Sequence, residues 1–126
     1  MRKTNQKGFT IIELLVVIVI IGILVALTLP NLFSAQARGR DTDRKNELKN
    51  LQQKLETYFN DNDEYPAALS NLDPAPTTDE TTGPRNDAYT YTPAADSQSY
   101  TLSANLENQN DKDATNGVFT LNSTNQ

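Results

Sequence analysis

The stretch FTIIELLVVIVIIGILVALTLP, residues 9–30, decides how this chain is organised. No charged side chain occurs from Leu14 to Ala37, and a helix of these 24 residues would reach roughly 36 Å. The hydrocarbon core of a bilayer is about 30 Å thick, so the stretch predicts a membrane-spanning helix. Glu13 is unusual there, because a charge inside such a segment costs on the order of 2.5 to 3.5 kcal/mol. We therefore expect Glu13 to have a partner.

A short basic segment precedes this stretch. Met1 to Lys7, MRKTNQK, is polar and positively charged, and Gly8-Phe9 stands at the edge of the apolar run. Positive charge beside a span tends to stay in the cytoplasm, so we expect the rest of the chain to face outward. Residues 7–30, KGFTIIELLVVIVIIGILVALTLP, resemble the N-terminal signature of type IV pilins and the related pseudopilins of type II secretion systems.

This resemblance implies a processing and assembly pathway. A prepilin peptidase would cut after Gly8 and remove a leader of residues 1–8, and Phe9 would become an N-methylated N-terminus. Glu13 falls on the acidic position of the family, and we expect it to pair with the Phe9 ammonium of a neighbouring subunit. The segment between Gly22 and Pro30, the two helix-weakening residues of the span, would lose helical hydrogen bonds when subunits pack into a filament.

The same resemblance implies partners and a location. Subunits would enter the cytoplasmic (inner) membrane as single-pass prepilins and leave it as a helical homo-oligomeric filament on the cell surface, served by an assembly platform protein and an ATPase. We expect a structural subunit of a type IV pilus. The alternatives are a major pseudopilin of a type II secretion system, towards which the short, cysteine-free tail leans, and a minor pilin for DNA uptake or adhesion.

A conventional cleavable secretion signal is an alternative from another class. The basic start and apolar stretch are followed by Ala35-Gln36-Ala37, which fits an A-x-A cleavage site and would release a soluble domain beginning at Arg38. However, the apolar stretch is longer than the usual length of about 7 to 15 residues, and Glu13 would have no purpose in a discarded peptide. A soluble domain that simply stays anchored in the membrane is the remaining alternative.

The helix is expected to continue beyond Pro30 and to end near 60–66, NDNDEYP, where Asn, Asp and Pro favour a turn. Residues 38–47 hold no large apolar side chain, so this part is either solvated or faces charged neighbours. A stripe at helical spacing then predicts the surface on which a C-terminal domain packs. Its members are Leu48, Leu51, Leu55, Tyr58 and Phe59.

Charge is distributed unevenly along the chain. Residues 38–54 hold six basic and three acidic side chains, whereas residues 55–126 hold two basic and twelve acidic ones. The basic side chains of the first segment either form a solvated face or meet acidic surfaces of neighbouring subunits. They include Arg38, Arg40, Arg44, Lys45 and Lys49. The acidic remainder is poorly suited to binding nucleic acid, which needs clustered Lys and Arg to neutralise phosphates.

Three strand candidates follow a loop at residues 69–83. They are AYTYT at 88–92, SYTLSANLE at 99–107 and VFTLN at 118–122. An antiparallel sheet laid over the helical stripe would bury both apolar faces. The sequence therefore predicts an α+β fold, with a membrane helix at 9–37 followed by an amphipathic helix and a small antiparallel β-sheet at 38–126 (a pilin fold).

The composition excludes several kinds of chemistry. The 126 residues include no cysteine and no histidine, so disulfides are impossible and a metal site could use only oxygen ligands. No G-x-S-x-G elbow, P-loop or G-x-G-x-x-G pattern occurs, so we do not expect an enzyme.

A calcium site is the one cofactor that the sequence suggests. The expected core is thin, and bound ions or neighbouring subunits would help to stabilise it. Residues 107–117, ENQNDKDATNG, gather oxygen-bearing side chains, with Asp111 and Asp113 as the best carboxylate ligands, although the spacing is not that of an EF-hand. Resemblance to major pseudopilins, which bind calcium in a loop near the C-terminus, supports this expectation. A solvated hairpin loop explains the same composition.

Overall fold

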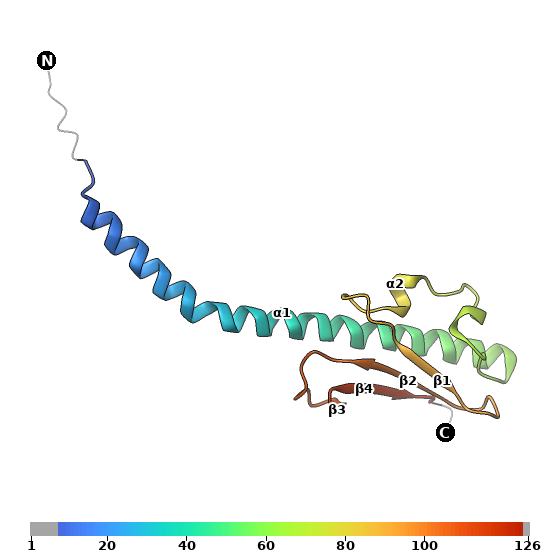
Figure 1. Ribbon diagram of the computed structural model, residues 1–126. Helices are drawn as coiled ribbons and strands as arrows, with labels where there is room; N and C mark the ends of the chain where they lie inside the picture. Colours follow the sequence, from blue (N-terminus) through green and yellow to red (C-terminus); the bar gives the residue numbers. More distant parts are fainter. Residues whose placement is uncertain (1–7, 125–126) are drawn as a thin grey trace, which may run out of the picture. The chain divides into compact units, whose positions relative to one another are not determined.

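The computed structural model describes residues 8–124 and is dominated by one helix, α1, Ile11–Asn62, which is 52 residues long (Figure 1). The chain divides into two compact units, and the second begins at Gln36. We call residues 36–124 the head. The last part of α1 belongs to the head and forms one of its two layers.

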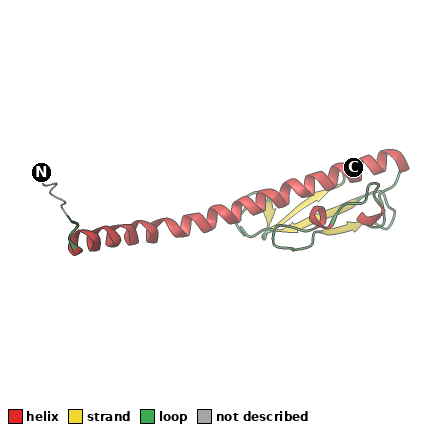
Figure 2. Ribbon diagram, turned by 90° about the horizontal axis from the view of Figure 1, so that it is seen from above, coloured by secondary structure: helices red, strands yellow, loops and turns green. Residues whose placement is uncertain are grey.

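The second layer of the head is a four-stranded antiparallel sheet. Its strands are β1 (Thr90–Pro93), β2 (Tyr100–Asn105), β3 (Ala114–Thr115) and β4 (Val118–Asn122), in the spatial order β1-β2-β4-β3. Figures 1 and 2 both show the sheet running alongside the C-terminal part of α1. The predicted α+β class, with a helix packed on a small antiparallel sheet, is confirmed.

The core lies between the helical stripe and one face of the sheet. Along β2 the side chains alternate between buried and exposed, and Leu102 pairs in register with Leu121 of β4 and Tyr91 of β1. The predicted stripe is confirmed, because its three leucines are fully buried and its two aromatic residues pack against them. The buried apolar residues are Leu48, Leu51, Leu55, Tyr65, Leu72, Tyr89, Tyr100, Leu102, Ala104, Leu106 and Phe119.

Polar contacts from the helix supplement this thin core. The Glu56 carboxylate accepts hydrogen bonds from the hydroxyls of Tyr65 at 2.8 Å and Tyr100 at 2.9 Å, and from the backbone N–H of Thr124 at 3.1 Å. The hydroxyl of Tyr89 donates to Glu47 in the same way. Burial and the neighbouring Glu56 carboxylate raise the pKa of Tyr65 to about 12, so this hydroxyl keeps its proton and remains a donor.

The segment after α1 differs in part from its prediction. The expected turn is confirmed, since α1 ends at Asn62 and Asp63 adopts a left-handed φ of 59°. The predicted loop at 69–83 instead contains a 3-10 helix, Leu69–Asn71, and a short helix α2, Thr78–Thr81. Helix α2 begins with a capping box in which Thr77 and Glu80 bond to each other's backbone N–H groups. The sequence signal for this helix is the T-x-x-E pattern of Thr77 and Glu80.

Strand β3 was not predicted. It pairs Ala114 and Thr115 with Phe119 and Val118 of β4 through a two-residue turn. The turn residues, Asn116 and Gly117, both have positive φ, 51° and 74°, as an Asn-Gly hairpin turn requires. Two residues are too few to show an alternating pattern, so only the Asn-Gly pair could have revealed this strand.

Candidate functional site

The expected processing site is exposed. Phe9 has 89% of its surface accessible, and a Cβ placed on Gly8 would find no atom within 4 Å. Nothing in the described part of the chain would therefore hinder a peptidase there. Residues 1–7 of the expected leader lie outside the described residues.

Glu13 has a partner within its own chain. Its Oε2 accepts hydrogen bonds from the backbone N–H of Thr10 at 2.8 Å and from the Thr10 hydroxyl at 2.7 Å. The Glu13 N–H points back to the Thr10 hydroxyl oxygen at 3.3 Å, which completes a capping box at the start of α1. A carboxylate at this end also complements the positive end of the helix dipole. The sequence signal for this partner is the T-x-x-E pattern of Thr10 and Glu13, which the expectation of a partner in another subunit does not include.

An uncovered apolar surface follows the capping box. Every large apolar side chain from Phe9 to Phe33 has at least 42% of its surface exposed. Helix α1 is long and apolar enough to cross a membrane, and none of its most apolar 18-residue window is buried inside the chain. An apolar surface of this size marks contact with a membrane or with other proteins.

Helix α1 continues through Pro30. Proline has no N–H to donate to the carbonyl one turn earlier, so the helix lacks one hydrogen bond at this point. Two hydroxyls close to this point donate to other backbone carbonyls of the helix, Thr28 to Val25 at 3.1 Å and Ser34 to Pro30 at 3.0 Å. The expected loss of further helical bonds in a filament stays a prediction.

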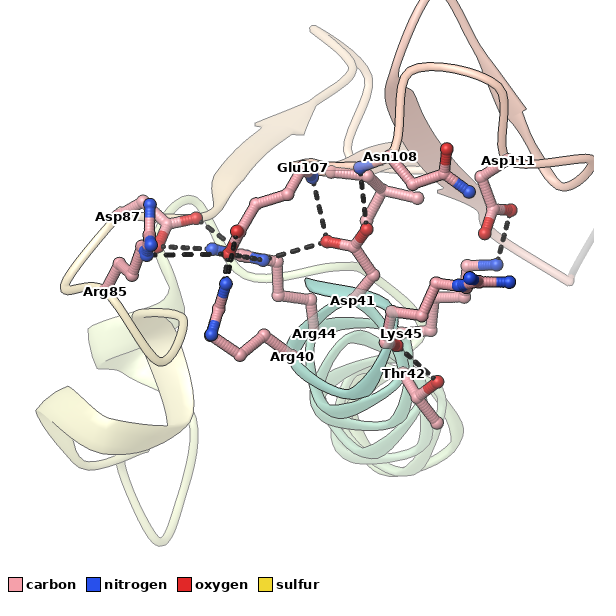
Figure 3. A network of polar contacts seen from close by, with 12 residues as sticks. Arg40, Asp41, Thr42, Arg44, Lys45, Arg85, Asp87, Glu107, Asn108 and Asp111 are labelled. Atoms are coloured by element: carbon pink, nitrogen blue, oxygen red, sulfur yellow. Dashed lines mark hydrogen bonds and ion pairs between the residues drawn. The ribbon is translucent and has the colours of Figure 1, made fainter. Parts of the chain in front are cut away.

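The charged segment at the start of the head forms an internal network (Figure 3). Arg44 is central to it, with only 2% of its side chain exposed. Its guanidinium donates to Asp41 at 2.9 Å, to both oxygens of Asp87 at 2.9 and 3.1 Å, and to Glu107 at 3.1 Å. Arg40 makes a bidentate pair with Glu107, both bonds being 2.7 Å long. These contacts attach α1 to the segments before β1 and after β2.

Asp41 contributes to the network as an acceptor. Its two oxygens receive the backbone N–H groups of Glu107 and Asn108, each at 2.8 Å. Asp41 therefore satisfies two donors that β-sheet pairing leaves free where β2 ends. Its own charge is balanced by the guanidinium of Arg44.

Gly83 gives this network the room that it needs. A Cβ at this position would lie 3.0 Å from the Arg44 Nε and from one Asp87 oxygen. The Gly83 N–H donates to the backbone carbonyl of Asp87 at 2.8 Å, so the backbone passes close to the ion pair. A larger residue would have to displace the guanidinium or the carboxylate.

The network shifts the titration of its members. Hydrogen bonds from Arg40 lower the pKa of Glu107 to about 2, and further hydrogen bonds from Arg44 act in the same direction. The pKa of Asp87 is lowered chiefly by its bonds to Arg44. Burial lowers the pKa of Arg44, but the bonds to Asp87 and Glu107 outweigh it and raise that pKa above its ordinary value. All these groups are therefore charged at neutral pH.

Lys45 extends the network to the 106–113 loop, which links β2 to β3. Its ammonium contacts Asp111 at 2.5 Å and Asp113 at 2.9 Å, and it lies 5.5 Å from the centre of the Phe119 ring. The structure thus brings the two suggested calcium ligands together, but around a lysine. Within residues 8–124, no group of three or more His, Cys, Asp or Glu side chains is placed to hold a metal ion.

Three of the basic residues thus have a role that differs from both roles expected from the sequence, a solvated face or contact with neighbouring subunits. Arg40, Arg44 and Lys45 pair inside the head, so they neither form a merely solvated face nor remain available for neighbouring subunits. Apart from Asp41, which lies one turn before Arg44, their partners lie 43 to 68 residues further along the chain, beyond the reach of helical spacing rules.

These features define a class of protein: a small α+β head that continues from a helix whose first part, residues 9–33, is an uncovered apolar arm with an exposed Gly8-Phe9 junction at its start. Comparisons agree with this class. Residues 3–29 match the model of the prokaryotic N-terminal methylation motif. Residues 31–123 match the model described as type IV minor pilin ComP, DNA uptake sequence receptor. The chain belongs to the type IV pilin and pseudopilin family, whose members are structural subunits and not enzymes.

Curated relatives come from both branches of this family. The type IV major pilin protein PilA of Myxococcus xanthus is 41% identical over 61 residues, which cover 48% of this chain and 28% of that protein. The type II secretion system core protein G of Aeromonas hydrophila is 38% identical over 73 residues, 58% of this chain and 51% of that protein. The type IV wide pilus major component PilA4 of Thermus thermophilus is 48% identical over 61 residues, 48% of this chain and 47% of that protein. The chain thus spans about half or less of these relatives, and no solved structure matches it.

Proposed function

We propose that this chain is a structural subunit of a type IV pilus, assembled into a surface filament after cleavage behind Gly8 and N-methylation of Phe9. The observation that carries the proposal is the uncovered apolar arm of α1, on which every large side chain from Phe9 to Phe33 is exposed. Burying one such side chain is worth roughly 1.5 to 3 kcal/mol. Packing arms against one another would supply the driving force that holds a filament together once subunits leave the membrane.

Glu13 would guide this packing. Cleavage creates an α-ammonium at Phe9, and two opposite charges about 4 Å apart attract by roughly 4 kcal/mol at an effective dielectric of 20. This is comparable with the cost of placing Glu13 in the membrane. The Phe9 ammonium of an incoming subunit would compete with Thr10 for the carboxylate and reward the correct axial register.

Two observations favour a pilus over a secretion pseudopilus. The family model that covers residues 31–123, and hence most of the head, is described as a type IV minor pilin and not as a secretion pseudopilin. In addition, Lys45 holds the two carboxylates from which a calcium loop of the major pseudopilin kind would have to be built. A prepilin peptidase, a platform protein and an ATPase would serve assembly, from the cytoplasmic membrane to the cell surface.

The composition of sheared filaments tests this proposal. In cells that express the chain, a pilus subunit should dominate the filament fraction, with an intact mass that begins at Phe9 and includes one extra methyl group. Deleting the gene should remove the filaments. A chain that stays in the cell envelope while protein export depends on it would instead be a pseudopilin, and a mature start at Arg38 would establish the secreted-domain alternative.

A substitution of Glu13 tests the assembly step separately. Glu13→Gln should still be cleaved and inserted into the membrane, but filament yield should fall strongly because the charge that pairs with the Phe9 ammonium is lost. Glu64→Gln is a matched control, since Glu64 is an exposed carboxylate in the turn after α1. Equal filament yields from the two variants would show that Glu13 has no pairing role.

A DNA-uptake role is a second candidate, because the model matching residues 31–123 is described as a DNA uptake sequence receptor. The electrostatics of the head oppose it, since Arg40, Arg44, Lys45 and Lys54 are all paired with carboxylates. Binding to duplex DNA, measured at several salt concentrations, separates the two roles. A structural subunit should show no saturable binding, whereas a receptor should bind with an affinity that falls steeply as salt rises.

A further inference from the structure

The 106–113 loop is held to α1 at both of its ends. Near its start, Asp41 accepts the backbone N–H groups of Glu107 and Asn108, each at 2.8 Å. Near its end, the Lys45 ammonium contacts Asp111 and Asp113. Asp41 and Lys45 are four residues apart on one helix, so they lie on the same face and reach the loop together.

The donor set around Lys45 does not suit a divalent cation. Calcium takes six to eight oxygen ligands, with the carboxylates directed at one point. Here the point on which Asp111 and Asp113 converge is the Lys45 Nζ, at 2.5 and 2.9 Å. The Glu107 carboxylate is already shared between Arg40 and Arg44.

The local backbone further commits the loop to this arrangement. The Asp111 Oδ1 that faces Lys45 also accepts the backbone N–H of Asp113 at 2.9 Å. The Asn108 side-chain oxygen accepts the backbone N–H of Asn110 at 3.2 Å, so this oxygen also bonds within the loop. The side-chain oxygens of Asn108 and Asp111, which are candidate calcium ligands, therefore already accept hydrogen bonds from the backbone of the loop.

We infer that the ammonium of Lys45 is the resident cation of the 106–113 loop, so that the head closes without a divalent metal. The ammonium is well placed for this role, because 16% of the side chain is exposed and the Phe119 ring lies 5.5 Å away. An aromatic face stabilises a cation that has lost part of its hydration. This inference departs from the calcium expectation, and it holds whichever filament the subunit builds.

Thermal unfolding of the full chain in detergent tests the inference. The midpoint for the unmodified chain should be the same in millimolar calcium and in chelator. Lys45→Gln should lower the midpoint by about 4 to 8 °C, the shift that corresponds to a loss of about 1 kcal/mol in a domain of this size. Lys49→Gln is the matched control, a change of the same kind one turn further along α1, and should leave the midpoint within experimental error. Lys45→Arg, which keeps the charge, should retain most of the stability and unfold at a midpoint close to that of the unmodified chain.

A double variant shows whether Lys45 acts through the loop carboxylates. Asp111→Asn in a Lys45→Gln background should cost clearly less than in the unmodified chain, because the partner is already gone. Strictly additive shifts would overturn the inference. So would a calcium-dependent rise of the midpoint in the unmodified chain, or a Lys45→Gln midpoint equal to that of Lys49→Gln.

Discussion

Arg44 carries its charge with 2% of its side chain exposed, because Asp41, Asp87 and Glu107 surround its guanidinium. Removing one partner from such a group is costly, since the charges left behind are neither hydrated nor paired. The sequence could not reveal this arrangement. Its residues looked like an ordinary charged helix face, and the carboxylates that change this reading come from two distant segments.

A substitution of Arg44 should therefore be among the most damaging in the head. Arg44→Leu leaves the buried Asp41 without a cation, and we expect it to lower the free energy of unfolding by about 3 to 5 kcal/mol. Urea denaturation of the full chain in detergent measures this change. Arg40→Leu is the comparison, because 26% of the Arg40 side chain is exposed and Glu107 would keep its bond to Arg44. Similar losses from both variants would contradict a central role for Arg44.

The same network predicts an acid transition. The pKa of Glu107 falls from an ordinary value of 4.5 to about 2, through the hydrogen bonds of Arg40 and Arg44. A carboxyl whose pKa is lowered by folding contributes stability above pH 4.5 and loses it as the pH falls towards 2. Stability measured by denaturation at a series of pH values should decline across this window. Glu107→Gln should be less stable at neutral pH, and its stability should decline less steeply as the pH falls. An unchanged slope of stability against pH would show that Glu107 does not cause the acid transition.

At the scale of elements, the sequence predicts best those helices and strands whose apolar pattern repeats over many residues. The helical stripe and the alternation along β2 place the core, because each repeats over several residues and only one face can be buried. Elements of two and four residues, β3 and α2, carry no period and were missed. Their signals are local ones, an Asn-Gly turn and a capping box. The capping of α1 by Thr10 was missed for the same reason.

The hairpin of β3 and β4 provides a test at this scale. Gly117 has a φ of 74°, and a Cβ there would overlap the side chain of Gln109. Gly117→Val should cost at least about 1 to 2 kcal/mol, the penalty for a left-handed conformation in a residue with a Cβ. Hydrogen exchange of the β4 amides should become faster. Asn116→Gly, at the other turn position, should be tolerated because glycine adopts positive φ freely, and equal exchange in both variants would contradict this account.

At the scale of the whole molecule, processing can be separated from folding. A Cβ on Gly8 meets no atom within 4 Å, so Gly8→Val should not disturb the described part of the chain. We expect it to block cleavage, because a residue without a side chain suits a peptidase site at the membrane edge and valine adds a branched one. Unprocessed chains should then accumulate in the membrane. Intact mass measures the result. Gly39→Ala is the control, since Gly39 is also surrounded by open space. Normal removal of the leader from Gly8→Val would place the cleavage site elsewhere.

The ion-pair network has a further consequence in the order of synthesis. Arg40, Arg44 and Lys45 emerge from the ribosome long before Asp87 and Glu107, so residues 38–54 of a nascent chain, with six basic and three acidic side chains, keep a net positive charge until the later carboxylates arrive. Arg44 would stay hydrated until then, because burying a charge without its full set of partners is costly. The carboxylates of Asp87 and Glu107 reach it only when the segments before β1 and after β2 dock on α1. The start of the head can therefore close only after synthesis has passed Glu107.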